Sequence, residues 1–231
     1  QLCLLPCNGS GDAFIVCSRI ESYFKKKKTP FLLISINQNI KEIGKLFQIK
    51  SVYTIMEQDM NRLLSFVRYY GLENLGNVKI MHFDPPYSYT HITAELAGYK
   101  GMLFRQMYVS DVFDGMPWDM AAPPQISEKV REEVEALFVR KKLIEGKTVL
   151  LFPYTNTLPQ CSRKEWEVFV QGLLAAGFCV CTNTALEEQT IPGTRSVFFS
   201  YEMLLASVDR MGYVVGIRSG IFDMIASCRC K

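Results

Sequence analysis

Two short segments of this 231-residue sequence combine glycines with a charged side chain in a way that could serve catalysis or ligand binding. Gly9-Ser10-Gly11-Asp12 comes soon after the apolar run Leu2–Pro6. Arg218-Ser219-Gly220 follows the apolar run Tyr213–Ile217 and precedes a predicted helix from Ile221 onward. A helix N-terminus offers unpaired N–H groups, glycine permits close approach, and arginine can hold two phosphate oxygens at once. The alternative for the second segment is a tight strand-to-helix turn with a solvated arginine.

Asp12 is the candidate carboxylate of the first segment. A carboxylate can act as a general base that removes a proton from an attacking hydroxyl. Glycines at 9 and 11 favour a sharp turn that would present Asp12 on a loop, predicted over Asn8–Ala13. Aspartate is also a common residue at helix starts, where it caps free N–H groups. The two roles are compatible, and the sequence leaves both open.

The segments lie in a chain whose apolar runs alternate with helical patterns. The first half has predicted strands at 2–6, 30–36, 51–55 and 78–83, with helices at 14–24, 40–47 and 60–71. The second half has predicted strands at 147–154, 178–183, 196–200 and 213–217, with helices at 128–143, 163–177 and 201–211. This alternation indicates parallel sheets that are covered by helices on both faces.

A proline-rich, aperiodic stretch at 115–127 separates the two series and predicts a linker. We therefore expect an α/β fold with two Rossmann-like halves, an N-terminal domain at 1–124 that includes the linker and a C-terminal domain at 125–231. The carboxyl ends of the strands would face a cleft between the halves, as in doubly wound folds.

At this level the sequence resembles glycosyltransferases of the GT-B fold, in particular bacterial heptosyltransferases and related capsular or surface polysaccharide enzymes. Three motifs carry the resemblance, namely "GSGDAF" after the first strand, "TVLLFPYTNTLPQCSRKEWEVFVQGLLAAGFCVCTN" and "YVVGIRSGIFDMIAS". Heptosyltransferases usually have an acidic residue where this chain has Arg218. The closing strand and helices of the family are missing after Lys231, which indicates a truncated C-terminal end.

The resemblance implies an enzyme that transfers a sugar from a nucleotide-sugar donor, bound by the second half, to a glycan or lipid-linked glycan acceptor on the first. It implies inversion, no metal and no cofactor, with Asp12 as the base. The leaving nucleoside diphosphate would need a cation and N–H donors, which Arg218, Ser219 and Gly220 could supply. The other residues assigned to the donor are Thr155, Asn156, Lys164 and Asp223, and those assigned to the acceptor are Ser10, Gly11 and His91.

Each of these further assignments has a structural alternative. Thr155 and Asn156 could simply close their loop, and Lys164 could be an exposed lysine at a helix start. Asp223 could interact with the dipole of the last helix rather than with a ribose. His82 and His91 flank a loop rich in aromatic and hydroxyl groups, which suits stacking on a sugar but is also typical of ordinary packing.

Composition narrows the classes of function. A formal net charge of +3 gives no sign of a nucleic-acid partner. The run Lys25–Lys28 indicates a solvated helix end or, alternatively, a peripheral contact with anionic lipid at the inner membrane surface. The eight cysteines lie mostly in apolar runs without histidine clusters, so we expect free thiols and a reducing compartment. The resemblance to bacterial heptosyltransferases implies a bacterial, cytoplasmic enzyme.

Two other functions fit the same pattern of elements. One is a sugar-nucleotide epimerase of the same fold, which would need more acid and base groups than the sequence offers. The other is a non-catalytic nucleotide-binding or scaffold domain. Release of free nucleotide from the donor would separate an enzyme from a pure binder.

Overall fold

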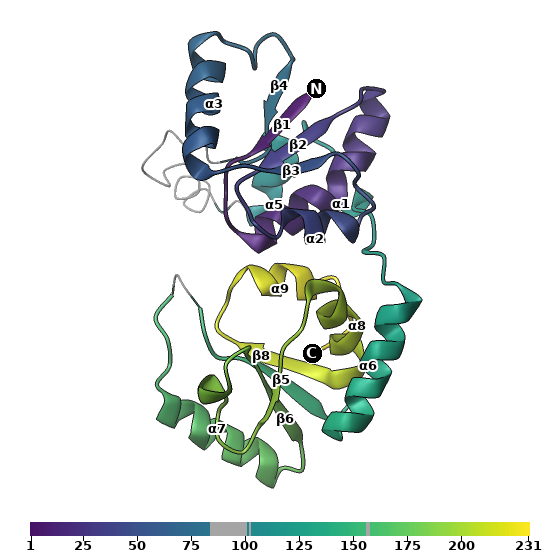
Figure 1. The fold of residues 1–231 in the computed structure, drawn as a ribbon, viewed down its shortest axis with the longest axis vertical. Helices are drawn as coiled ribbons and strands as arrows, with labels where there is room; N and C mark the ends of the chain where they lie inside the picture. Colours follow the sequence, from purple (N-terminus) through teal and green to yellow (C-terminus); the bar gives the residue numbers. More distant parts are fainter. Residues whose placement is uncertain (84–100, 102, 156–157) are drawn as a thin grey trace. The chain divides into compact units, whose positions relative to one another are not determined.

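The computed structural model describes residues 1–83, 101, 103–155 and 158–231, and it divides the chain into two compact units. Unit 1 comprises Gln1–Gln125 and unit 2 comprises Ile126–Lys231. Each unit contains a four-stranded sheet in which every pairing is parallel, with helices packed against it (Figure 1). The predicted α/β class with two parallel sheets is confirmed.

The sheet of unit 1 has the strand order β3-β2-β1-β4. Its strands are β1 (Leu2–Leu5), β2 (Leu32–Ser35), β3 (Val52–Thr54) and β4 (Val78–Ile80). The helices are α1 (Ser10–Lys27), α2 (Ile40–Lys45), α3 (Glu57–Tyr69) and α5 (Phe104–Met107), followed by a π-helical turn η1 (Tyr108–Val112) and a 3₁₀ turn η2 (Trp118–Met120).

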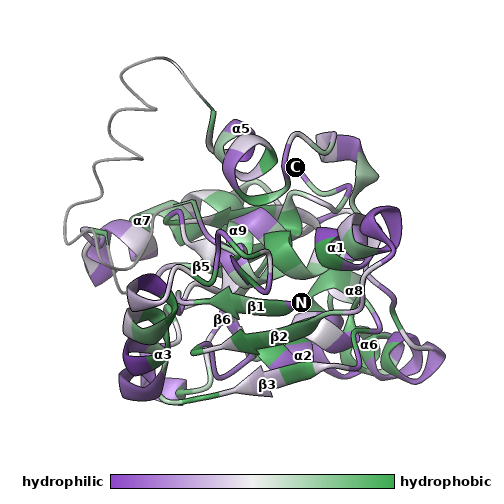
Figure 2. Cartoon of the chain, turned by 90° about the horizontal axis from the view of Figure 1, so that it is seen from above, coloured by the Kyte–Doolittle hydropathy of each residue, from purple (hydrophilic) through white to green (hydrophobic). Residues whose placement is uncertain are grey.

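The middle of this sheet is apolar because helices cover both faces. Met60, Leu64 and Val67 recur at helical spacing along α3 and pack on one face of the strands. Helices α1 and α2 lie against each other on the other side of the sheet (Figure 1). Figure 2 shows the resulting pattern, with hydrophobic β1 and β2 and a largely hydrophilic α3.

Helix α1 starts earlier than the sequence predicts, and this changes the setting of Asp12. The helix begins at Ser10 rather than near Phe14, so Ser10, Gly11 and Asp12 form its first turn instead of a loop. The prediction of a loop over Asn8–Ala13 is therefore wrong from Ser10 onward. The physical reason is that Gly9 takes an extended conformation as N-cap, so the glycine at 11 lies at a helix end, where it does not interrupt the helix.

Unit 2 repeats the same arrangement with the strand order β7-β6-β5-β8. Its strands are β5 (Thr148–Phe152), β6 (Cys179–Asn183), β7 (Arg195–Val197) and β8 (Gly212–Gly216). Its helical elements are α6 (Glu128–Lys141), α7 (Arg163–Ala175), a 3₁₀ turn η3 (Glu187–Gln189), α8 (Tyr201–Met211) and α9 (Gly220–Ile225).

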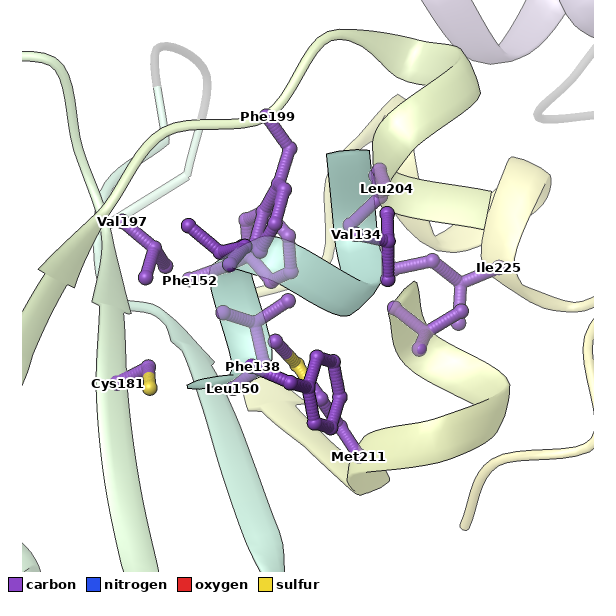
Figure 3. Close-up of a cluster of buried hydrophobic side chains, with 12 residues drawn as sticks. Val134, Phe138, Leu150, Phe152, Cys181, Val197, Phe199, Leu204, Met211 and Ile225 are labelled. Atoms are coloured by element: carbon purple, nitrogen blue, oxygen red, sulfur yellow. The ribbon is translucent and has the colours of Figure 1, made fainter. Parts of the chain in front are cut away.

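Two apolar clusters hold unit 2 together, one on each face of its sheet. The larger cluster joins α6, α8 and α9 to the strands, and Figure 3 shows Val134, Phe138, Leu150, Leu204 and Met211 within it. The smaller cluster packs α7 on the opposite face through Trp166 and Val170. Capping fixes the helix starts, because Ser127, Ser162 and Ser200 each accept a backbone hydrogen bond at the beginning of α6, α7 and α8.

The predicted linker belongs to unit 1 as far as Gln125, whereas its last two residues, Ile126 and Ser127, belong to unit 2. The backbone N–H of Ala122 donates to Ser18 at 2.7 Å, and that of Gln125 donates to Leu46 at 2.6 Å. The buried guanidinium of Arg19 lies over the ring of Trp118 at 3.5 Å. Arginine stacks well on an aromatic face, so this contact fixes η2 against α1.

All eight cysteines are free thiols in the structure. Cys3, Cys17, Cys179 and Cys181 are buried in the apolar interior, as the sequence predicts, whereas Cys161 is exposed. No helix in the described residues is both long enough and apolar enough to cross a membrane.

Candidate functional site

The carboxylate of Asp12 lies at the carboxyl edge of the sheet of unit 1. Asp12 is the third residue of α1, and its Oδ1 accepts a hydrogen bond from the hydroxyl of Tyr108 at 2.7 Å. Tyr108 is fully buried in η1, so its ring cannot easily move away. A side chain at Gly9 would collide with Asp12, because a Cβ there would lie 2.2 Å from Oδ2. Glycine and tyrosine together fix the position of the carboxylate.

His82 and Cys7 complete a cluster around Asp12. Nε2 of His82 lies 3.9 Å from Oδ1 of Asp12, and the side chains of His82 and Asp12 are 16% and 23% exposed. The ligand atoms of Cys7, Asp12 and His82 all lie within 4.8 Å of one another. Burial, followed by the charge of Asp12, raises the pKa of the Cys7 thiol well above its ordinary value.

The strand order explains why these residues meet. β1 pairs not only with β2, the next strand along the chain, but also with β4. In this second pairing Leu4 lies opposite Ile80, and the backbone N–H of Met81 donates to the carbonyl of Leu4 at 2.7 Å. Residues that follow both strands therefore emerge side by side. Cys7 and His82 are each two residues beyond the end of their strand. Acid, imidazole and thiol groups thus gather at one edge, where proton transfer or ion binding is chemically feasible.

Unit 2 presents Arg218 at the matching edge of its own sheet. Arg218 follows β8, and its Nη2 lies 2.8 Å from Oδ1 of Asp223, one turn into α9. The Arg218 side chain is 63% exposed, whereas that of Asp223 is 21% exposed. Gly216 is the last residue of β8, and a Cβ there would lie 2.5 Å from the carbonyl oxygen of Phe152, so this position requires glycine. Arg218 therefore follows a strand and precedes a helix, as predicted, and it is paired with a carboxylate. The strand β8 is only half-buried, however, and not buried as the sequence predicts.

The remaining predicted donor residues have separate surroundings. Thr155 is buried, and its carbonyl accepts a hydrogen bond from Gln160 at 2.7 Å. Lys164 lines a surface depression of ≈ 440 Å³ together with Ser162, Glu165 and Val168, all from the start of α7. Lys164 therefore has different neighbours from Arg218, which pairs with Asp223. The donor roles of Thr155 and Lys164 stay predictions.

Two predicted residues, Asn156 and His91, lie outside the described residues, so their assignments remain predictions. Ser219 and Gly220 form the N-cap and the first residue of α9, and Ser219 is extended. Ser10 and Gly11 lie in the first turn of α1 beside Asp12. Their predicted contact with the acceptor is likewise untested by the geometry.

Sequence reasoning missed Tyr108 and gave Cys7 no role at the site. Tyr108 lies 96 residues from Asp12, and nothing in its neighbourhood in sequence indicates that its hydroxyl reaches Asp12. The sequence places His82 only beside a loop rich in aromatic and hydroxyl groups. The pairing of β4 with β1 could have placed it near Asp12, but the order of strands within a sheet cannot be read from their order along the chain.

Comparison with known proteins gives a consistent picture of the fold. No protein-family model matches the chain, and no curated protein matches it. Among solved structures, a glycosyl transferase family 9 protein from Veillonella parvula DSM 2008 superposes with a TM-score of 0.57 at 12% identity, covering 98% of this chain and 77% of the other. The E. coli ADP-heptose LPS heptosyltransferase II gives a TM-score of 0.59 at 9% identity, covering 98% and 82%.

A third solved structure, E. coli heptosyltransferase WaaC with ADP, gives a TM-score of 0.54 at 9% identity and covers 99% of this chain and 84% of the other. Each match spans nearly all of the present chain. The chain therefore has the two-sheet α/β fold of these glycosyltransferase structures, and the fold expected from the sequence motifs is confirmed.

Proposed function

We propose that this protein is an inverting, metal-independent glycosyltransferase that moves a sugar from a nucleotide-sugar donor to a cell-surface glycan acceptor. The observation that carries the proposal is the Asp12 carboxylate, which Tyr108 holds at the carboxyl edge of β1. In such a transfer the acceptor hydroxyl must lose a proton as it attacks the anomeric carbon. A positioned and only partly solvated carboxylate suits this task.

Unit 2 would bind the donor through Arg218. The departing nucleoside diphosphate gains negative charge, and a guanidinium with backbone N–H groups can stabilise it. Arg218 uses Nη2 to contact Asp223, but a guanidinium has five N–H donors, so others remain for phosphate oxygens. Asp223 would then orient Arg218 through their ion pair, and its contact with a ribose stays a prediction.

The comparisons suggest which donor to test first. The similar E. coli structures are named for ADP and ADP-heptose, so ADP-heptose is the first candidate donor for this chain. The acceptor would be a glycan or lipid-linked glycan. The exposed Lys25, Lys26 and Lys28 at the end of α1 could contact anionic lipid head groups, and the free thiols suit a cytoplasmic protein at the inner membrane.

Replacement of Asp12 by asparagine tests the proposal. Asp12→Asn keeps the size of the side chain and a hydrogen-bonding oxygen for Tyr108, but it removes the base. We expect sugar transfer to fall by about 10²–10⁴-fold, the usual range for a lost general base. Transfer is measured with ADP-heptose and a lipid-linked glycan acceptor, and donor affinity by calorimetry should stay within about twofold.

The matched control is Asp59→Asn, which alters an exposed aspartate in the first turn of α3. It should leave transfer unchanged. Full activity in Asp12→Asn would refute the role of Asp12 as base. A wild-type protein that binds nucleotide sugar but never releases free nucleotide would instead support the non-catalytic alternative.

A further inference from the structure

The cluster of Cys7, Asp12 and His82 has the composition of a site for a transition-metal ion. Thiolate, imidazole and carboxylate are the three groups that bind Zn²⁺ in proteins, and three protein ligands leave a fourth position open. Within the described residues these three side chains form a group whose ligand atoms lie within 4.8 Å of one another. Small rotations of the side chains would bring these atoms to three corners of a tetrahedron around one ion.

The backbone around the cluster is well fixed. Cys7 and His82 extend from neighbouring strands whose register is set by the Met81 N–H bond to Leu4. Asp12 is anchored in the first turn of α1. Cys7 follows β1, His82 follows β4 and Asp12 lies in α1, so the three ligands come from three separate segments of unit 1.

The groups around the ligands suit a metal site as well. Tyr108 donates to Oδ1 of Asp12, and such an outer partner orients a ligating carboxylate. The ring of His82 stacks on that of Phe83, with centroids 4.7 Å apart, so the imidazole is braced on one face. The three side chains are partly buried, which limits competition from water while leaving a path to solvent.

We propose that Cys7, Asp12 and His82 bind a thiophilic divalent cation of the Zn²⁺ type. Binding deprotonates the Cys7 thiol and releases its proton to solvent, as metal coordination of a thiol requires. This proposal does not depend on the proposed sugar transfer. It has a consequence for it, however, because an ion on Asp12 occupies the carboxylate that would act as base. Zn²⁺ is then an inhibitor of transfer rather than a cofactor.

Titration of the full chain with Co²⁺ tests the site, because cobalt bound to a thiolate gives a charge-transfer absorption band. We expect one equivalent of Co²⁺ to bind with this band, and Zn²⁺ to displace it. Cys7→Ser should abolish the band, and His82→Ala should weaken Co²⁺ binding strongly. Tyr108→Phe should weaken it by about 10–100-fold, the range for an outer-shell partner. Cys161→Ser, at an exposed cysteine outside the cluster, is the matched control and should change nothing.

A second measurement does not depend on any variant being folded. Zn²⁺ should protect Cys7 of the wild-type chain from alkylation, as read by peptide mass spectrometry, while Cys161 stays reactive. A cobalt band that persists in Cys7→Ser, or equal alkylation of Cys7 with and without Zn²⁺, would overturn the site. If Zn²⁺ protects Cys7 while transfer continues at its normal rate, the inhibitory consequence is wrong although the site stands. Absence of transfer under all conditions would count against the proposed function alone.

Discussion

The two units share one backbone plan but differ in the side chains that it presents. The sheets have the orders β3-β2-β1-β4 and β7-β6-β5-β8. In both, the strands that come third, second, first and fourth along the unit lie next to one another in that order. In unit 1, Met81 N–H donates to Leu4 at 2.7 Å, and in unit 2, Ile217 N–H donates to Phe152 at 3.1 Å. His82 and Arg218 each come one residue after that donor, so they occupy equivalent positions.

At these equivalent positions the surroundings diverge. His82 is mostly buried and lies 3.9 Å from Asp12, a carboxylate of the helix after the first strand of its unit. Arg218 is mostly exposed and lies 2.8 Å from Asp223, a carboxylate of the helix that follows Arg218 itself. One edge thus holds groups that can exchange protons in a partly buried setting, and the other holds a permanent cation open to an anionic ligand. The same fold can therefore serve two chemical tasks in one chain.

The largest effect we expect among tests of this difference is on nucleotide binding by unit 2. Arg218→Ala should weaken binding of ADP by about 2–3 kcal/mol, the scale for charge-assisted hydrogen bonds. Calorimetry measures it, with Arg131→Ala, an exposed arginine of α6, as control. Unchanged affinity in Arg218→Ala would mean that the exposed arginine is only a solvated turn residue.

Next in size is the effect of adding a side chain at Gly216, where the backbones of β5 and β8 approach closely. Gly216→Ala places a Cβ 2.5 Å from a backbone oxygen, so the strands must move apart at a cost of about 1–3 kcal/mol in unfolding free energy. Unit 1 has Ile80 at the equivalent register position, which shows that only unit 2 requires glycine there. Urea unfolding measures the loss.

The control for Gly216→Ala is Gly172→Ala in α7. A Cβ at Gly172 has nothing within 4 Å, and alanine favours the helix by up to about 1 kcal/mol. This variant should therefore be as stable as the wild type or more stable. Equal stability of both variants would show that the approach of β5 to β8 is not tight.

A smaller effect is expected from the hydroxyl that holds Asp12. Tyr108→Phe removes the hydrogen bond at 2.7 Å while it keeps the buried ring, so sugar transfer should fall roughly tenfold, a loss of about 1.5 kcal/mol for a bond to a charged group. Initial rates in the sugar-transfer assay provide the measurement. Wild-type rates in Tyr108→Phe would indicate that the backbone alone positions the carboxylate.

The smallest effect concerns the ion-pair networks of the two units. The central group is a carboxylate in unit 1 and a guanidinium in unit 2. In unit 1 Asp114 accepts hydrogen bonds from Lys27, Tyr23 and Lys79, whereas in unit 2 Arg210 pairs with Glu135 and Glu145. Partial burial raises the pKa of Asp114, but the hydrogen bonds from these three side chains outweigh it and hold the pKa below its ordinary value.

A depressed folded-state pKa means that this contribution to stability is present above the unfolded pKa of about 4 and is lost as the pH falls below it. The Asp114 side chain is 48% exposed, so screening by solvent limits the contribution to below about 1 kcal/mol. Asp114→Asn should therefore destabilise the protein slightly at pH 7, and the difference from wild type should shrink toward about pH 3. Urea unfolding at both pH values measures it, and a constant difference would contradict the linkage.

Some features of this protein follow from the sequence alone. The alternation of apolar runs with amphipathic segments specifies parallel strands and covering helices, because each element must bury its own apolar side. Serine at the starts of α6, α7 and α8 fixes those boundaries locally. The segment Arg218-Ser219-Gly220 is likewise recognisable in the sequence, because it places a charge and a glycine between an apolar run and a predicted helix.

Other features were decided only by the tertiary structure. The start of α1 at Ser10 depends on the extended conformation of Gly9. Because α1 starts there, Asp12 lies on a helix and not on the expected loop. Asp12 meets His82 through the pairing of β4 with β1, and it meets Tyr108, 96 residues away, through the packing of η1. No local pattern encodes these contacts. Local sequence sets which elements form, because hydrogen bonds and side-chain periodicity within an element are local. Which side chains share a site is set by long-range strand pairing and packing.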